Sequence, residues 1–246
     1  MSGARRFFAD GVVLGGECFL TGEEFEHART VLRVREGDEV ILLSGDGKEY
    51  SSIVTSVGKK EIALHVVSAQ PCEKEPRSEI ALYFGFLKNA DKNEFAVQKA
   101  VELGVSRIVL FTSEYSSAFL SENKAERLKK VAREAAKQCL RAVSPTIEVL
   151  SSFDEVLNDA KRYENRLFAC EFADKSDEPL SDLDEEKAKN GVCVIIGSEG
   201  GFSESEAAKA RENGCVFVSL GRRILRAETA ATALLSVVAY QVGELR

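Results

Sequence analysis

The 246-residue chain has a formal net charge of −7, with 44% hydrophobic and 30% charged residues. This composition is that of a globular protein large enough for two domains, and the negative charge excludes nucleic-acid binding driven by net charge alone. The N-terminus lacks the apolar core of a signal peptide, and the apolar stretch 230–242 is shorter than the roughly 20 residues that a membrane span needs. The six cysteines are scattered without a C-x-x-C pair. We therefore expect a cytoplasmic protein with reduced thiols and no metal site.

The first part of the chain alternates short β-like runs with turns. The peptides S-G-D-G-K-E and V-G-K-K-E are hairpin turn signals, and only 23–32 has a helical pattern. The β-like runs cover 17–20, 39–43, 50–57 and 61–67. This pattern predicts a small β-barrel or sandwich. The stretch 68–79 holds two of the chain's four prolines and many charges, which is typical of a linker.

Beyond the linker, apolar runs alternate with segments of helical periodicity. The apolar runs predict buried strands over 80–87, 107–112, 166–172, 192–197 and 216–220. The periodic segments predict helices over 91–103, 121–141, 152–160, 204–213 and 228–242. This alternation indicates a parallel α/β sheet covered on both faces, in which ligands bind beyond the carboxyl ends of the strands. The loops that follow the last two strands are expected to converge on one site.

The loop after the 192–197 strand reads G-S-E-G-G and precedes a polar helical segment. Its spacing is neither the dinucleotide G-x-G-x-x-G nor the phosphate-binding G-x-x-x-x-G-K-[ST]. The loop contains no lysine, and Glu199 places a negative charge where a pyrophosphate would lie. A neutral or cationic ligand therefore fits this loop better than a phosphate.

Basic residues gather in two places of this acidic chain. The segment 121–141 has seven Lys and Arg residues against three Glu, which indicates either a surface for a polyanion or a solvated helix face. Arg222, Arg223 and Arg226 follow the 216–220 strand and suggest an anionic ligand, with simple surface arginines as the alternative. Glu228 and Thr229 begin the last helix, where capping alone would explain them.

Two motifs together identify a family. I-G-S-E-G-G-F-S-E-S-E, followed by L-G-R-R-I-L-R-A-E-T-A, resembles the 16S ribosomal RNA uridine N3-methyltransferase family (RsmE-like) of the SPOUT superfamily. The resemblance extends to R-R-F-F near the start, H-A-R-T-V-L-R-V-R-E-G-D at 27–38 and L-K-N-A-D-K-N-E-F-A-V-Q-K-A-V-E-L-G-V at 87–105. It departs at Ser198, where the family usually has proline, and at Cys139 and Leu140, where the family has small residues.

The resemblance implies the fold, the cofactor and the assembly. A PUA-like β-barrel that binds RNA is expected over 1–72, and a SPOUT methyltransferase domain with a C-terminal trefoil knot over 73–246. S-adenosylmethionine and a homodimer are also implied. The cofactor suits the sequence of the loop, because it carries a sulfonium cation and no phosphate.

The resemblance also implies site residues. Cofactor contacts are expected from Phe86, Leu87, Gly197, Glu199, Gly200, Leu220, Gly221, Ile224 and Leu225. The candidates for catalysis are Arg141, Arg226 and Glu199. RNA contacts are expected from Arg5, Arg6, His27, Arg29, Arg33, Arg35, Lys88, Gln138 and Arg222, although an ordinary polar surface position explains His27 equally well.

The implied function is transfer of a methyl group to N3 of a uridine in 16S ribosomal RNA, within the small ribosomal subunit. N3 is protonated at neutral pH, so a base or a cation that stabilises the uracil anion is required. One alternative is a SPOUT methyltransferase that acts on another RNA, such as a tRNA ribose or base. The other is a non-catalytic RNA-binding assembly protein.

Overall fold

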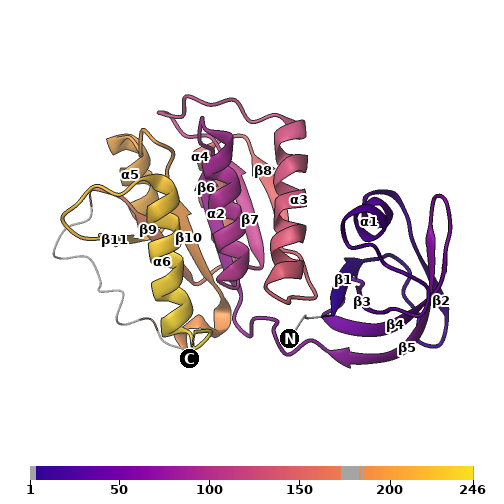
Figure 1. The fold of residues 1–246 in the computed structure, drawn as a ribbon. Coiled ribbons are helices and arrows are strands. Elements are labelled where there is room, and N and C mark those ends of the chain that lie inside the picture. The colour runs from indigo at the N-terminus through magenta and orange to yellow at the C-terminus, as the bar shows by residue number, and fades with distance from the viewer. Residues whose placement is uncertain (1–3, 173–182, 184–185, 246) are drawn as a thin grey trace. The chain divides into compact units, whose positions relative to one another are not determined.

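The computed structural model describes residues 4–172, 183 and 186–245 (Figure 1). The chain divides into two units by its internal contacts. The first unit comprises Met1–Glu75 together with Ala136–Ser144, and the second comprises Pro76–Ala135 together with Pro145–Arg246. The boundary predicted from the sequence, after residue 72, lies three residues before the one found in the structure. The sequence also did not predict that the segment 136–144 belongs to the first unit.

The first unit is built on a five-stranded sheet with the order β1-β3-β4-β5-β2. Its strands are β1 (Arg5–Phe8), β2 (Glu17–Leu20), β3 (Glu39–Leu43), β4 (Lys48–Val57) and β5 (Ile62–Pro71). Only the β1–β3 pair is parallel, and the other pairs are antiparallel. Alternate residues of β5 are buried in its first half, as one buried sheet face requires. Both predicted hairpins, β3–β4 and β4–β5, are confirmed.

Three features of the first unit differ from the sequence-based expectation. The R-R-F-F run forms strand β1, which was not predicted because four residues are too few to show an alternating pattern. The 23–32 helix is instead a short α-helix, α1 (Gly22–Glu26), continued by a π-helical turn, η1 (His27–Val31). The linker begins later than expected, because β5 pairs with β4 as far as Pro71.

The second unit is a six-stranded sheet with the order β11-β9-β10-β6-β7-β8, in which every pair is parallel. The strands are β6 (Ile80–Gly85), β7 (Arg107–Phe111), β8 (Thr146–Leu150), β9 (Asn165–Ala169), β10 (Val192–Ile196) and β11 (Val216–Val218). Every residue of β6, β7 and β10 is buried, which explains their continuous apolar runs. Strand β8 was missed because its sequence, T-I-E-V-L, lacks such a run.

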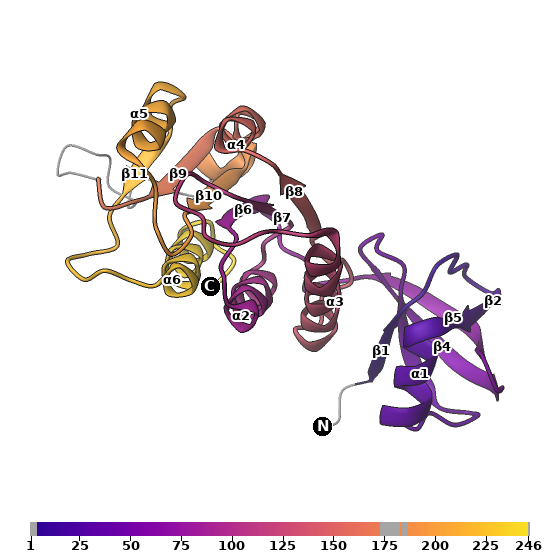
Figure 2. The same cartoon turned by 90° about the horizontal axis from the view of Figure 1, so that it is seen from above.

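Helices cover both faces of this sheet, as expected (Figure 2). They are α2 (Ala90–Glu102), α3 (Glu122–Gln138), α4 (Phe153–Ala160), α5 (Glu204–Glu212) and α6 (Ala227–Gln241), with a 3₁₀ turn η3 (Lys187–Asn190) before β10. Helix α3 ends three residues before the predicted boundary. In Figure 2, α2 and α6 lie side by side on one face, and α4 and α5 lie on the other.

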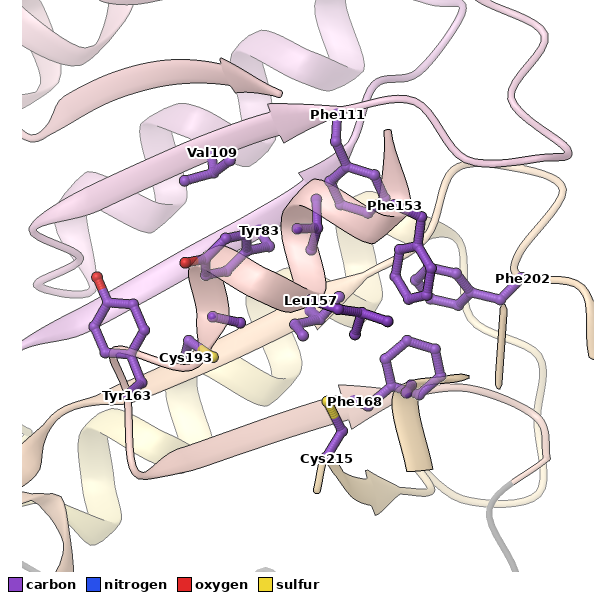
Figure 3. Packing of buried hydrophobic residues seen from close by; sticks show 14 of the residues in the cluster. Tyr83, Val109, Phe111, Phe153, Leu157, Tyr163, Phe168, Cys193, Phe202 and Cys215 are labelled. Atoms are coloured by element: carbon purple, nitrogen blue, oxygen red, sulfur yellow. The ribbon is translucent and has the colours of Figure 1, made fainter. Parts of the chain in front are cut away.

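The core between the sheet and helices α4 and α5 is rich in aromatic rings (Figure 3). The Phe202 ring centroid lies 4.4 Å from that of Phe168 and 5.2 Å from that of Phe153. Phe202 follows directly on the glycine loop, so the apolar residue of G-G-F anchors the end of that loop in the core. The knot implied by the resemblance stays a prediction.

Candidate active site

Because all strands of the second unit are parallel, their carboxyl ends lie along one edge of the sheet. Strands β6 and β10 are neighbours at its centre, and the loops 86–89 and 197–203 follow them. The loop 112–121 follows β7 on one side. The loop 219–226 follows β11 on the other, with β9 between β11 and β10. The two loops predicted to converge therefore share the edge, although their strands are not neighbours.

The loop Gly197–Gly201 is a tight turn against β6. Its ends form a bridge, with the Gly201 N–H donating to the Ser198 carbonyl at 3.0 Å. A Cβ atom on Gly85, the last residue of β6, would lie 2.4 Å from the Ser198 nitrogen, and a Cβ on Gly197 would lie 3.0 Å from the Phe202 ring. A Cβ on Gly200 would lie 2.6 Å from the Tyr115 Cβ. These glycines are therefore required by close approach of neighbouring chain segments.

Carboxylates hold this loop to its neighbours. Glu199 is exposed, and its Oε1 accepts a hydrogen bond from the Lys88 N–H at 3.0 Å. Glu206 is buried and closes a capping box with Ser203 at the start of α5, while its Oε1 accepts from the Glu114 N–H at 2.9 Å. The loops after β6, β7 and β10 are thus joined by side-chain to main-chain bonds.

Ser198 stands where the resemblance leads us to expect proline. Its side chain is 5% exposed, and its Oγ is buried without a hydrogen-bond partner among the described residues. A buried hydroxyl without a partner is costly. It marks a place within the loop where a polar ligand atom or a water molecule would be stabilised.

The predicted contacts Phe86 and Leu87 are buried directly after β6. The Leu87 N–H donates to Asn93 Oδ1 at 2.9 Å, and the Leu87 carbonyl accepts from Asn93 Nδ2 at 2.8 Å. Their position at the carboxyl edge is therefore fixed by the first turn of α2. Lys88, the next residue, is exposed.

The loop 219–226 is open to solvent. Gly221 has a φ of +97°, and a Cβ atom added to it would meet no other atom within 4 Å, while Ile224 is 97% exposed. Leu220 and Leu225 are partly buried, and Arg222 is exposed. Arg226 is exposed at the N-cap of α6. Among the described residues, no hydrogen bond or ion pair joins this loop to 197–201.

Arg141 and Gln138 lie in the first unit, within the returning segment 136–144. Arg141 is 3% exposed, and its Nε lies 3.4 Å from Glu75 Oε2. Gln138 is exposed at the last residue of α3. The structure therefore does not bring Arg141 into the same unit as Glu199 and Arg226.

The predicted RNA-contacting arginines of the first unit fall into two groups. Arg5 and Arg6 form salt bridges with Asp38 and Glu49, at 2.5 and 2.6 Å. Arg29, Arg33 and Arg35 are exposed on and after the π-helical turn. Arg33 has a φ of 50°, a left-handed conformation that residues other than glycine seldom adopt.

Sequence reasoning missed the exposed Lys59 and Lys60 in the β4–β5 turn, which we group with the exposed Arg29, Arg33 and Arg35 as the cationic surface of the first unit. The Arg29 guanidinium donates to the Lys59 carbonyl at 3.2 Å and so ties η1 to that turn. Both lysines line a hollow of about 600 Å³ with Gly22, Glu23, Phe25 and Glu26. His27 is partly buried, with its ring edge-on to Phe7 at 6.3 Å. The turn was recognised in the sequence, but its position against α1 depends on the tertiary fold.

The part of the chain that the structure describes contains neither a membrane-spanning helix nor a metal-binding cluster. None of its helices combines the length and apolar character needed to span a membrane. In the same residues, no three His, Cys, Asp or Glu side chains gather in a group that could hold a metal ion.

Comparisons with known proteins agree with this architecture. Residues 73–239 match the family described as an RNA methyltransferase domain, and residues 20–67 match the RNA methyltransferase PUA domain. The chain is 33% identical over 234 residues to ribosomal RNA small subunit methyltransferase E of Bacillus subtilis, covering 92% of this chain and 91% of that protein. The chain belongs to the ribosomal RNA small subunit methyltransferase E family.

Further proteins are similar to this chain in sequence or in fold. The Mesomycoplasma hyopneumoniae protein of the same name is 36% identical over 165 residues, covering 66% of this chain and 70% of that one. The Neisseria gonorrhoeae enzyme bound to S-adenosyl methionine superposes with a TM-score of 0.86 at 25% identity, covering 96% and 97% of the two chains. A putative methyltransferase of Legionella pneumophila in complex with the same cofactor gives 0.84 at 28% identity, covering 96% and 97%.

Proposed function

We propose that this protein uses S-adenosylmethionine to methylate N3 of a specific uridine in 16S ribosomal RNA of the small ribosomal subunit. The observation that carries the proposal is the glycine turn at the carboxyl edge of a parallel sheet, which lacks the residues that bind phosphate and packs against the end of β6 and the loop after β7. Membership of the family supports the methyl donor and the ribosomal RNA substrate. The uridine, the atom N3 and the small subunit are taken from the resemblance of the two C-terminal motifs.

The residues at the edge fit this cofactor chemically. The Gly197–Gly201 turn has no lysine or arginine, and Glu199 stands exposed on it. Glu171 Oε2 lies 3.9 Å from the Cβ position of Gly201. Two carboxylates beside main-chain groups suit a cation that carries no phosphate. The unpartnered Ser198 hydroxyl adds a polar group to the same loop.

Two loops would hold the cofactor. We assign Gly197, Glu199 and Gly200 to its ribose and methionyl parts, with Phe86 and Leu87 beside them. Its adenine is assigned to the main chain of Leu220, Gly221, Ile224 and Leu225. When bound, this cofactor supplies an activated methyl group. The protein therefore does not need to activate the donor. Its task is to hold uridine N3 in line with the methyl group.

The chain must also deal with the proton on uridine N3. The Lys88 N–H occupies only one oxygen of Glu199, so the carboxylate retains the capacity to accept a proton. We assign the stabilisation of negative charge on the uracil to Arg226, which is exposed at the start of α6. Arg141 is buried beside Glu75 in the first unit, and a catalytic role for it stays a prediction.

RNA is expected to bind the first unit through exposed cations. Arg29, Arg33 and Arg35, together with Lys59 and Lys60, supply positive charge on a chain that is acidic overall. Arg5 and Arg6, engaged by carboxylates, are better suited to holding β1 in place. The homodimer implied by the resemblance also stays a prediction.

The proposal is tested on ribosomal RNA directly. Small subunits from cells that lack this protein are incubated with the purified protein and labelled S-adenosylmethionine, and the product nucleoside is identified by mass spectrometry. We expect 3-methyluridine in 16S RNA of treated subunits and none in untreated ones. Label in tRNA, or on another atom, would favour a methyltransferase of different specificity. Failure of the folded protein to bind S-adenosylmethionine in calorimetry would favour the non-catalytic assembly role.

A further inference from the structure

Two exposed aromatic side chains stand on the loop between β7 and α3. Tyr115 is 51% exposed and Phe119 is 79% exposed. An aromatic ring left in water gives up the stabilisation that burial provides. Two such rings within five residues, at the edge of the sheet where the candidate site lies, indicate a surface that another molecule covers.

The loop carries Tyr115 directly against the glycine turn. A Cβ on Gly200 would lie 2.6 Å from the Tyr115 Cβ and 2.8 Å from the Tyr115 carbonyl oxygen. The loop is also held from both sides of Tyr115. The Glu114 N–H donates to Glu206 Oε1 at 2.9 Å, and the Ser113 N–H donates to Ser116 Oγ at 2.8 Å. The tyrosine is therefore fixed at the glycine turn through its main chain while much of its side chain faces solvent.

Lys124 links Phe119 to Phe86, the residue that follows β6 at the candidate site. The Lys124 ammonium donates to the Phe119 carbonyl at 2.6 Å and lies 5.3 Å from the centre of the Phe86 ring. Phe86 follows β6 and is itself 4% exposed. The Lys124 ammonium and the exposed Phe119 ring therefore lie in the same part of the structure, shortly after Tyr115 in the sequence.

A base that is methylated on N3 must leave its pair and its stack, because N3 lies on the pairing edge. Proteins that hold unstacked bases replace the lost stacking with aromatic side chains. Tyr115 at the glycine turn, a second exposed ring on the same loop and a lysine in the first turn of α3 supply the aromatic and cationic groups that bind a short single strand.

We propose that Tyr115 and Phe119 form a stacking platform for the RNA substrate. Tyr115 stacks on the target base after it has left the helix, Phe119 stacks on the adjacent base of the strand, and Lys124 lies at the phosphate between them. This inference rests on the proposed function, and it adds three substrate-binding residues, Tyr115, Phe119 and Lys124, that no glycine or arginine motif contains.

The test compares leucine variants, which keep the size and apolar character of the side chain, with aromatic ones. Tyr115→Leu and Phe119→Leu should each weaken binding to unmethylated small subunits by about tenfold, since stacking contributes roughly that much per base. Tyr115→Phe and Phe119→Tyr should restore binding to within about twofold. Val149→Ala, which changes an exposed apolar residue of β8, serves as the control.

The readouts separate this inference from the proposed function. Affinity for S-adenosylmethionine, measured by calorimetry, should be the same in all variants. The KM for subunits should rise in the leucine variants. Equal subunit affinity in the wild-type protein and both leucine variants would overturn the platform, even if the wild-type protein transfers methyl groups normally. If the wild-type protein transfers none, the proposed function fails instead, while loss of subunit binding in the leucine variants alone would still support the platform.

Discussion

At the scale of single residues, the site depends on positions where a side chain cannot be added. Gly85 and Gly200 lie where two segments meet more closely than a Cβ atom permits, and a Cβ on Gly197 would press on the Phe202 ring at 3.0 Å. Neighbouring main chain, rather than a flexible side chain, limits the space at Gly85 and Gly200. The glycine spacing was visible in the sequence, but the constraints come from distant segments: Ser198 limits the space at Gly85, and Tyr115 of the β7–α3 loop limits it at Gly200.

Gly200→Ala should displace the glycine turn, because the added methyl group would lie 2.8 Å from the Tyr115 carbonyl oxygen. We expect the affinity for S-adenosylmethionine, measured by calorimetry, to fall by about tenfold or more, the equivalent of one lost hydrogen bond from the turn to the cofactor. Ser205→Ala, on the exposed surface of α5, is the control and should bind normally. Unchanged affinity in a correctly folded Gly200→Ala protein would argue against the turn as the cofactor site.

Glu199→Gln tests whether the carboxylate accepts the N3 proton. The amide oxygen of glutamine still accepts the Lys88 N–H, so the loop should keep its position. If Glu199 acts as the base, kcat at saturating cofactor should fall by about 10²-fold or more, the usual contribution of general base catalysis, whereas loss of its cofactor contact alone should raise only the KM for the cofactor. A kcat within a few-fold of wild type would remove Glu199 as the base and leave stabilisation of the uracil anion by Arg226 as the principal candidate.

At the scale of elements, an ion-pair network joins the strands to helix α4. Arg107, the first residue of β7, lies 2.6 Å from Glu148 Oε2 of β8 and 2.6 Å from Asp159 Oδ2 of α4. It also donates to the Tyr83 hydroxyl of β6 at 3.0 Å. The hydrogen bond from Arg107 lowers the pKa of Glu148. For Asp159, burial opposes ionisation, but hydrogen bonds from Tyr83 and Arg107 still lower its pKa.

This network should make stability depend on pH in the acidic range. Because both carboxyl pKa values are lower in the folded chain, the stabilisation is complete above their unfolded values of about 4 and is lost as pH falls through the folded values. Arg107→Met should cost about 2–3 kcal/mol at pH 7, since it removes the Arg107 cation from the partly buried Asp159, which is then left with its ion pair to Arg162. The cost, measured by urea unfolding, should shrink near pH 3. An equal cost at both pH values would contradict this explanation.

At the scale of the whole molecule, the chain leaves its first unit and comes back to it. The segment 136–144 joins that unit because the Glu75 carboxylate accepts the N–H groups of Ala142 and Val143, at 2.5 and 2.8 Å. Lys137 adds an ion pair with Glu24 at 3.2 Å. The first unit is therefore built from two parts of the chain. Its cationic surface likewise combines residues 29–35 with the β4–β5 turn, which are separated in the sequence.

The exposed lysines of the β4–β5 turn should contribute to RNA affinity through phosphate contacts. Lys59→Ala/Lys60→Ala should weaken subunit binding and lower the slope of log affinity against log salt by about one to two, as expected when one or two phosphate contacts are lost. The double variant Lys161→Ala/Lys189→Ala removes two exposed lysines of the second unit and should leave the slope unchanged. Equal slopes in wild type and the Lys59/Lys60 variant would exclude this turn from the interface.

The sequence by itself determined the type of most elements, the parallel α/β class of the second unit and the chemical character of its glycine loop. Each of these follows from local pattern: apolar runs, helical periodicity and the residues present in a turn. It did not determine β1, β8 or the π-helical turn, because short edge strands and a local change of helix type leave little periodicity to detect. Only the tertiary structure decided the strand order, the return of 136–144 and the contact between Tyr115 and Gly200. These depend on packing between residues distant in sequence, which no local pattern encodes.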